Sequence, residues 1–301
     1  MTVTATDPGP RERAEKKVGF ADRELPFPLP PTFDSVDTER EYRKKQLADG
    51  FRIFGRLGFS EGVTGHITVR DPGEPDTFWV NPFGMAFSRI KPSDLVRCDH
   101  DGNVLEGRFH VNRPAFVIHA EVHRARPDAV ASAHAHSLHG KAFSTLGIPL
   151  DPLTPDACAF FEDHGVYAEF GGVANDVEEG QRIAKAIGDH KAAILQNHGL
   201  ITVGKSVAEA VWWFVSMDRA CQAQLLAMAA GIPKPIDRES ALKVREQTGG
   251  HFSGWFQAQP MWAELAVSDS GPFDIPVTVT ENYDRHVRTV ASSVRDVVSG
   301  S

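Results

Sequence analysis

The sequence predicts an α/β protein in which strands and helices are intermixed within one body, roughly residues 38–232. Short apolar runs between glycine, proline and aspartate predict strands, and longer amphipathic stretches predict helices. With 301 residues, of which 41% are hydrophobic, the chain has enough apolar side chains for a sizeable core. No internal repeat is visible, so we expect one domain over this range.

The first elements are a leader and a helix. Residues 1–37 are predicted to be a flexible leader, because they are rich in proline and charge and contain the run LPFPLPPTFD. A helix is predicted from Asp37, its expected N-cap, to Gly58. Its apolar residues follow helical spacing: Leu47, Phe51, Phe54 and Phe59.

Strands are predicted next, within residues 62–71 and 76–82, around the turn DPGEPD. A further strand, turn and strand are predicted over 93–107, with Asp101-Gly102 as the turn. The following helix should run from about Pro114 to Arg126, because proline suits a first helical turn and the next proline stops the helix.

The second half is predicted to contain a strand, a short helix, an amphipathic helix, a buried strand pair and a long helix. These cover residues 129–137, 137–147, 177–190, 191–204 and 206–231. Ser206 and Glu209 open the long helix as a capping box. Residues 233–301 have a weaker pattern and are predicted to be an extension that packs on the domain or a subunit interface, ending in a loose helix or tail.

Composition excludes several classes of function. The formal net charge is −8 with no basic block, so we expect no nucleic-acid or membrane partner. No apolar run approaches the roughly 18 residues of a membrane helix. The N-terminus lacks the apolar core of a signal peptide. The three cysteines form no CxxC pair, so we expect a protein of the reducing cytoplasm.

Three histidines stand out by position. His134 and His136 lie two apart in AHAHS, so on a strand both imidazoles point to the same face. His198 follows a second apolar strand, where the chain turns at a glycine. Three neutral imidazoles suit a catalytic divalent ion such as zinc, manganese or iron. The alternative is that they are solvated or hydrogen-bonded core residues.

Other polar groups have two interpretations each. His119 and His123 have the i, i+4 spacing of helical metal ligands, but we interpret them as an ordinary helix face. Glu162, Asp163 and His164 could supply a fourth ligand or a general base. They could equally be a polar strand end or turn.

The motifs RPD, HxH and NHG occur in that order, in ARPDAVASAHAHSLHGKAFSTLG and KAAILQNHGLITVG. With the long helix that follows, they resemble the class II aldolase/adducin family over about residues 40–232. The resemblance implies a three-layer α/β/α fold with a central, largely antiparallel sheet. It implies a homotetramer with sites between adjacent subunits. It also implies one divalent metal ion per subunit, zinc first with iron or manganese as alternatives, held by His134, His136 and His198.

The sequence departs from the sugar-phosphate members of this family. Ala115 occupies the place of their catalytic glutamate, and a methyl group cannot transfer a proton. Their glycine-asparagine phosphate turn reads Gly65-His66 here, and a later phosphate-loop segment reads Asn81-Pro82-Phe83-Gly84. We therefore do not expect an ordinary sugar-phosphate aldolase. The segments EPDTFWVNPFG, DACAFFEDHGVY, QNHGL and GWFQAQP resemble a branch of the family that includes a decarboxylase and a non-haem iron oxygenase.

The first functional hypothesis is a metal-dependent lyase that cleaves a C–C bond of a small carbonyl or hydroxy-carboxylate substrate, by retro-aldol cleavage or decarboxylation through a metal-stabilised enolate. Glu162, Asp163 and His164 are the expected proton donors or acceptors. Lesser candidates are Glu121 and His66, and Arg89 or Lys91 could pair with a substrate carboxylate. The alternatives are a non-haem iron(II) oxygenase for an aromatic α-keto or hydroxy acid, and a non-catalytic adducin-like scaffold.

Overall fold

The computed structural model describes residues 27, 29–169 and 177–270. The chain divides into two units, and residues 32–271 form the unit described below. Most of the predicted leader and all of the predicted tail after residue 270 lie outside the described residues. None of the described helices combines the length and the apolar character that a membrane span requires.

The centre of this unit is an eight-stranded sheet with the order β4-β3-β2-β1-β5-β8-β7-β6. Neighbouring strands are antiparallel except β6 and β7, which are parallel. The strands are β1 His66–Arg70, β2 Thr77–Val80, β3 Val96–Asp99, β4 Val104–Glu106, β5 Ala131–Ala135, β6 His164–Tyr167, β7 Ala192–Leu195 and β8 Gly199–Gly204.

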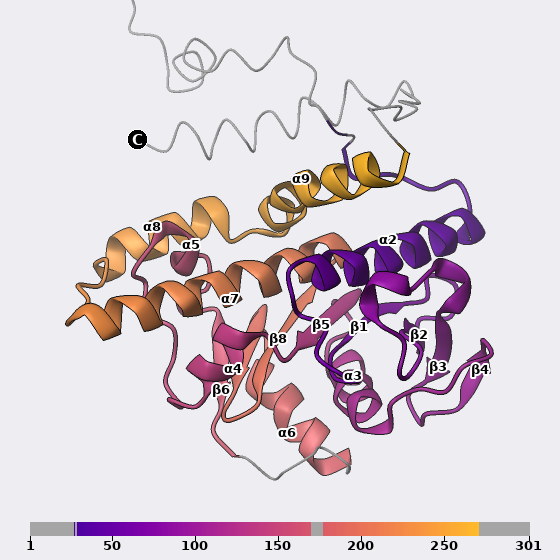
Figure 1. Ribbon diagram of the computed structural model, residues 1–301, viewed down its shortest axis with the longest axis horizontal. Coiled ribbons are helices and arrows are strands. Elements are labelled where there is room, and N and C mark those ends of the chain that lie inside the picture. Colours follow the sequence, from indigo (N-terminus) through magenta and orange to yellow (C-terminus); the bar gives the residue numbers. More distant parts are fainter. Residues whose placement is uncertain (1–26, 28, 170–176, 271–301) are drawn as a thin grey trace, which may run out of the picture. The chain divides into compact units, whose positions relative to one another are not determined.

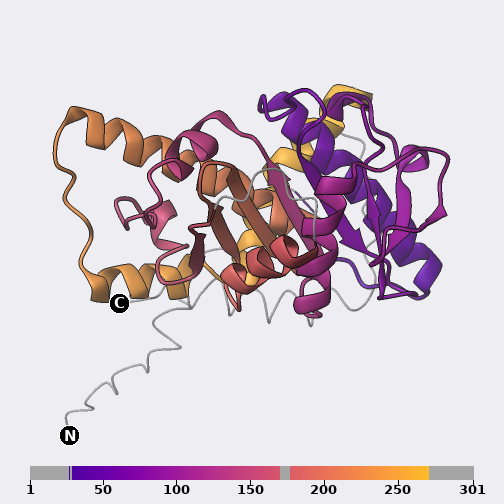
Figure 2. The same ribbon diagram turned by 90° about the horizontal axis from the view of Figure 1, so that it is seen from below.

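Helices cover both faces of the sheet (Figures 1 and 2). The long helices α2 (Val36–Arg56) and α7 (Val207–Ala230) pack on one face, and α3 (Arg113–Ala125) and α6 (Val177–Ile187) pack on the other. Shorter elements connect them: α4 Leu138–Ser144, α5 Pro155–Cys158, and the 3-10 turns η1 Phe87–Arg89 and η2 Pro92–Asp94. This arrangement confirms the predicted three-layer α/β/α fold with a largely antiparallel sheet.

The alternation of side chains along β5 decides where polar groups lie. Ala131, Ala133 and Ala135 belong to the apolar cluster under α2 and α7. Ser132 and His134 therefore face the opposite layer, which contains α3. Their partners across the strand pair are Thr68 and His66 of β1, so four polar side chains share one face of the sheet.

The RPD motif joins the end of α3 to the segment after α6. The Nη1 atom of Arg126 donates hydrogen bonds to the carbonyl oxygens of Gly188, at 2.7 Å, and His190, at 2.8 Å. Its Nε and Nη2 atoms pair with the carboxylate of Asp128, both at 2.8 Å. The motif is therefore a structural clamp between two segments on the same side of the sheet.

The boundaries of the first helix differ from the prediction at one end. Its N-cap is Ser35 and not Asp37, because the Ser35 side chain accepts the backbone N–H of Thr38 at 3.2 Å. The predicted end is confirmed: Gly58 has φ +79°, a conformation that favours glycine, and the chain leaves the helix there.

The region after residue 232 holds two helices that the sequence pattern did not predict. Helix α8 (Arg238–Thr248) packs on α5, and α9 (His251–Ser270) packs on α7 and α2. Strand β6 was also missed. The boundary that we place at residue 232, between the domain and its extension, remains a prediction.

Candidate metal centre

His134 is held rigidly in the middle of the sheet. Its backbone pairs with Ile201 of β8, and its side chain is buried. Its Nδ1–H donates to the carbonyl oxygen of Leu200 at 2.7 Å. This bond fixes the tautomer and leaves Nε2 with a lone pair, which is how metal-binding histidines are commonly oriented.

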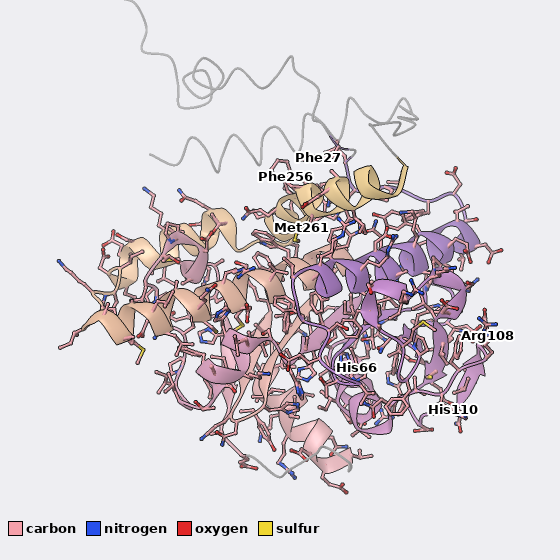
Figure 3. All side chains as sticks on the ribbon, viewed as in Figure 1. Phe27, His66, Arg108, His110, Phe256 and Met261 are labelled. Carbon is pink, nitrogen blue, oxygen red and sulfur yellow. The ribbon has the colours of Figure 1, made fainter. Side chains whose placement is uncertain are left out.

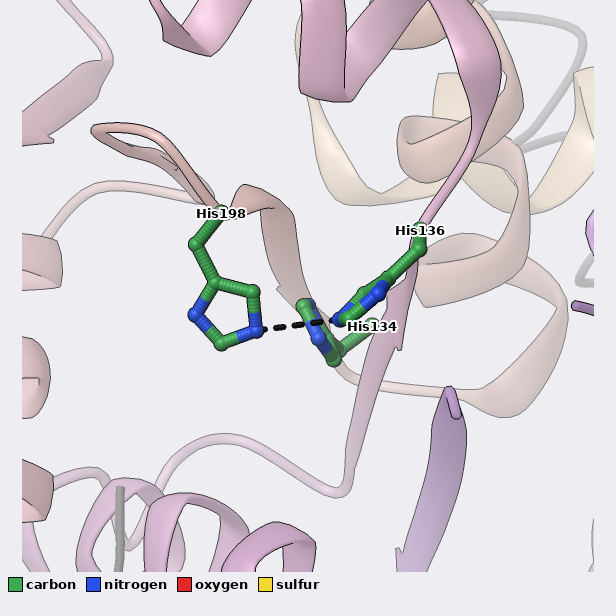
Figure 4. A group of neighbouring side chains, drawn as sticks. All are labelled: His134, His136 and His198. Carbon is green, nitrogen blue, oxygen red and sulfur yellow. Dashed lines mark hydrogen bonds between the residues drawn. The ribbon is translucent and has the colours of Figure 1, made fainter. Parts of the chain in front are cut away.

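His136 and His198 complete the group. His136 follows the end of β5, and His198 lies in the turn between β7 and β8, where its backbone N–H bonds to Leu195. The Nε2 atoms of His136 and His198 are 3.1 Å apart (Figure 4). One potential ligand atom from each of the three residues lies within 4.8 Å of the others. The structure therefore brings together the three histidines that the motifs singled out.

The protonation states suit metal binding. Burial, followed by the neighbouring His136, lowers the pKa of His198 to about 4. Burial, followed by His198 and His136, holds the pKa of His134 well below its usual range, and burial lowers that of His136. All three imidazoles are therefore neutral near pH 7, as metal ligands must be. These donors fit a divalent ion with open coordination positions.

His66 lies opposite His134 in the β1–β5 strand pair, in the place of the altered phosphate turn, and is labelled in Figure 3. Its Nδ1 atom is 3.1 Å from Oδ1 of Asn81, and its Nε2 atom is 3.5 Å from Nδ2 of Asn112. Burial, opposed by the hydrogen bond to Asn81 and assisted by nearby His136, lowers the pKa of His66 to about 4. The surroundings are polar and uncharged at neutral pH.

A buried group of hydrogen-bonded side chains joins β1 to α3 and consists of Thr68, His119 and His123. The Thr68 hydroxyl lies 3.0 Å from Nδ1 of His119 and 2.8 Å from Nε2 of His123. The two histidines are on the buried face of α3, each 1% exposed. They are not part of the three-histidine group. Among the described residues, Nε2 of His119 and Oγ of Ser132 have no hydrogen-bond partner.

Glu162, Asp163 and His164 are not brought to the three histidines within one chain. They lie at β6, and strands β7 and β8 separate β6 from β5. Glu162 binds Arg238 at 2.8 Å, and Asp163 binds Lys191 at 3.0 Å. Nε2 of His164 accepts the backbone N–H of Leu150 at 2.9 Å. Their catalytic role remains a prediction.

The lesser candidates also have other partners. Glu121 is buried on α3 and forms an ion pair with Arg124. Arg89 and Lys91 line a cavity beside α2, together with Asp49. That cavity contains none of the three histidines.

Sequence reasoning missed the ion pair between Glu61 and Lys141. The Nζ atom of Lys141 is 2.5 Å from Oε2 of Glu61, and the charges of both residues act on His136. Their 80-residue separation gives no pairing signal. The signal available in the sequence was the position of Lys141, less than two helical turns after the HxH motif.

The family described as "Class II Aldolase and Adducin N-terminal domain" matches residues 45–225. The chain belongs to the class II aldolase/adducin family. The match covers the sheet from β1 to β8 and most of the helices around it, and it includes all three histidines.

Two Streptomyces proteins are among the relatives of this class II aldolase/adducin protein. "Decarboxylase NovR" of Streptomyces niveus is 48% identical over 237 residues, which are 78% of this chain and 88% of that protein. "4-hydroxy-3-prenylphenylpyruvate oxygenase/4-hydroxy-3-prenylbenzoate synthase" of Streptomyces roseochromogenus subsp. oscitans is 47% identical over 237 residues, 78% of this chain and 86% of that protein.

A solved structure, "L-fuculose 1-phosphate aldolase" from Glaciozyma antarctica, is similar to this chain with a TM-score of 0.74 and 43% identity. The alignment covers 80% of this chain and 95% of that structure. Together with the decarboxylase relative, it confirms the predicted class of an aldolase- or decarboxylase-like enzyme.

Proposed function

We propose that this protein is a metal-dependent enzyme that cleaves a carbon–carbon bond of a small carbonyl or hydroxy-carboxylate substrate, by decarboxylation or retro-aldol cleavage. The observation that carries the proposal is the convergence of three imidazoles whose ligand atoms lie within 4.8 Å of one another. Because all three are neutral at pH 7, they can bind a cation without first losing protons.

His134, His136 and His198 would hold one divalent ion per subunit, zinc first, with iron or manganese as alternatives. When bound, such an ion acts as a Lewis acid that stabilises negative charge developing on a substrate oxygen. The chain's own contribution is rigidity. The hydrogen bond from His134 to Leu200 and the turn at His198 fix the ligand positions before any ion arrives.

The neighbourhood of His66 supports a carbonyl or carboxylate substrate rather than a sugar phosphate. His66, Asn81 and Asn112 offer neutral polar groups at the site of the phosphate turn. The first turn of α3 has Ala115 where sugar-phosphate members have glutamate, so the usual proton carrier is absent at that position. The decarboxylase relative agrees with this direction.

A second candidate function is a non-haem iron(II) oxygenase acting on an aromatic α-keto or hydroxy acid. The relative named an oxygenase favours it, because its identity to this chain is 47%, against 48% for the decarboxylase. Three histidines can hold iron and leave positions for oxygen and a keto acid, although this departs from the two-histidine, one-carboxylate set.

The proposal includes a cytoplasmic homotetramer whose sites lie between adjacent subunits. Such an assembly would bring Glu162, Asp163 and His164 of one subunit to the histidines of another. A non-catalytic adducin-like scaffold is the remaining alternative, and the retention of all three histidines argues against it.

Elemental analysis of protein purified without added metal, wild type beside His134→Ala, tests the metal. We expect about one ion per chain in the wild type and loss of it in the variant. Oxygen uptake with 4-hydroxy-3-prenylphenylpyruvate then separates the two reactions. Product formation under nitrogen supports the lyase, and product formation that requires oxygen supports the oxygenase. Absence of metal even after reconstitution would contradict both.

A further inference from the structure

Glu61 and Lys141 form a charged pair whose two charges both act on His136 of the three-histidine group. Their side chains are 41% and 38% exposed, so a substrate can reach them. Each charged atom is satisfied by the other at 2.5 Å. An exposed ion pair of this kind contributes little to stability, so stability gives little reason for its placement.

A tight turn holds Glu61 in place. The carbonyl oxygen of Glu61 accepts hydrogen bonds from the backbone N–H of Thr64 at 3.1 Å and from its hydroxyl at 2.6 Å. Gly62 and Gly65 have φ values of +59° and +90°, which other residues rarely adopt. A Cβ at Gly65 would lie 3.3 Å from Ala135, so the turn packs against the end of β5, next to His136.

Lys141 is tied to the backbone next to the same histidine. It lies on α4, and its backbone N–H bonds to Ser137, the residue after His136. Burial is the main cause of the lowered pKa of His136, and the charges of Glu61 and Lys141 raise and lower that pKa respectively. Both side chains of the pair are therefore within electrostatic reach of a metal-ligand candidate.

We propose that Glu61 transfers the proton during carbon–carbon cleavage, and that Lys141 is the positioning residue that holds its carboxylate. This inference rests on the function proposed above. Glu61 takes the role that Ala115 cannot fill, from the turn before β1 rather than from α3.

Within one subunit, the other carboxylates that could carry a proton are held by other partners. Glu162 is bound to Arg238 and Asp163 to Lys191, both at β6. Glu121 is buried against Arg124 on α3. Of these four carboxylates, Glu61 is the one whose charge acts on a histidine of the group.

The chemistry balances for both forms of cleavage. In retro-aldol cleavage, the Glu61 carboxylate takes the proton of the substrate hydroxyl. The C–C bond then breaks, and the electron pair of that bond stays with the fragment that holds the original carbonyl group. Glu61 then gives the same proton to that fragment's carbon. In decarboxylation, Glu61 first takes a proton from solvent, carbon dioxide leaves without the bonding electrons, and Glu61 gives that proton to the remaining carbon.

The test measures proton transfer apart from turnover. Metal-loaded protein is incubated under nitrogen in D2O with 4-hydroxy-3-prenylphenylpyruvate, and NMR follows deuterium exchange at the methylene beside the keto group. We expect Glu61→Gln to slow enzyme-dependent exchange by about 100-fold or more, the lower range for general acid–base catalysis. Elemental analysis should find the metal content unchanged.

Two comparisons separate proton transfer from a structural role. Lys141→Met should slow exchange and Lys141→Arg should restore it, because arginine keeps the cation. Glu74→Gln is the matched control, because Glu74 is 56% exposed and forms an ion pair with Arg97 at 2.8 Å, in the turn between β1 and β2. The Glu74→Gln variant should catalyse deuterium exchange at the wild-type rate.

The outcomes are distinct. Exchange by Glu61→Gln at the wild-type rate would overturn this inference and leave the proposed function standing. Loss of metal together with exchange in Glu61→Gln would show that Glu61 supports the histidines and would also overturn it. Absence of exchange and of cleavage in the metal-loaded wild type would overturn the proposed function, and this inference with it.

Discussion

The Nε2 atoms of His136 and His198 lie 3.1 Å apart, although the two residues are separated by 62 positions in the chain. Two nitrogen ligands about 2.05 Å from one tetrahedral ion would be about 3.3 Å apart. The protein alone therefore brings these atoms close to the spacing that an ion requires. The arrangement depends on adjacent strands β5 and β8, whose ends each carry one of the two imidazoles.

His198→Ala should lower metal affinity by more than about 100-fold, since even partners outside the first coordination sphere contribute roughly 10- to 100-fold. Equilibrium dialysis with zinc, followed by elemental analysis, measures this. His110→Ala is the control, because the His110 side chain is exposed and lies apart from His66 in Figure 3. Loss of activity with full metal retention in His198→Ala would contradict the proposed site.

Acid should destabilise the metal-free protein partly through His119. Burial lowers its pKa to about 3, whereas the unfolded chain has the ordinary value of 6.5. Between pH 6.5 and about 3, the unfolded state binds one more proton at this residue than the folded state does. The free energy of unfolding therefore decreases by about 1.4 kcal/mol for each unit that the pH falls. His119→Leu should flatten the slope of the urea unfolding free energy against pH between pH 6 and pH 4.

The predicted catalytic role of Glu162 can be separated from its ion pair with Arg238. If a neighbouring subunit's site uses this carboxylate, Glu162→Ala should lower turnover by about 100-fold or more and spare the metal. Arg238→Ala removes the same ion pair, in which the arginine side chain is 68% exposed, and should leave turnover nearly unchanged. Equal, small effects of both variants would show an ordinary surface pair.

Arg126→Ala should destabilise the fold without affecting metal binding. Its hydrogen bonds to the carbonyl oxygens of Gly188 and His190 come from a charged donor, and each such bond contributes about 1.5–3 kcal/mol. Thermal unfolding with a metal assay measures both effects. Arg219→Ala, an exposed arginine on α7, is the control. An unchanged melting temperature in Arg126→Ala would contradict the clamp.

Much of the fold was predictable because local patterns coincide with the elements. The alternation in AVASAHAHS predicts β5 and places His134 and His136 on one face, and the apolar run before His198 predicts β7. The glycine after His198 marks the turn. These are short-range signals, and together they bring two of the predicted ligands to one strand and the third to the adjacent hairpin.

The missed features depend on contacts between distant segments. Helix α9 contains Gly254 and Pro260, which disfavour helices. Gly254 packs against Trp213, where a Cβ would lie 2.5 Å from a ring carbon, so the approach of α7 explains the glycine. The pairing of Glu61 with Lys141 likewise exists only after the turn before β1 meets α4.

The family motifs of this chain have two separate roles, and Arg126 of RPD belongs to the structural one. Its hydrogen bonds join α3 to the segment after α6 and involve none of the three imidazoles. Selection for folding alone would therefore preserve RPD in a descendant that had lost its chemistry. The proposed chemistry depends instead on the histidines of HxH and NHG, so losing them would leave the fold without its metal site.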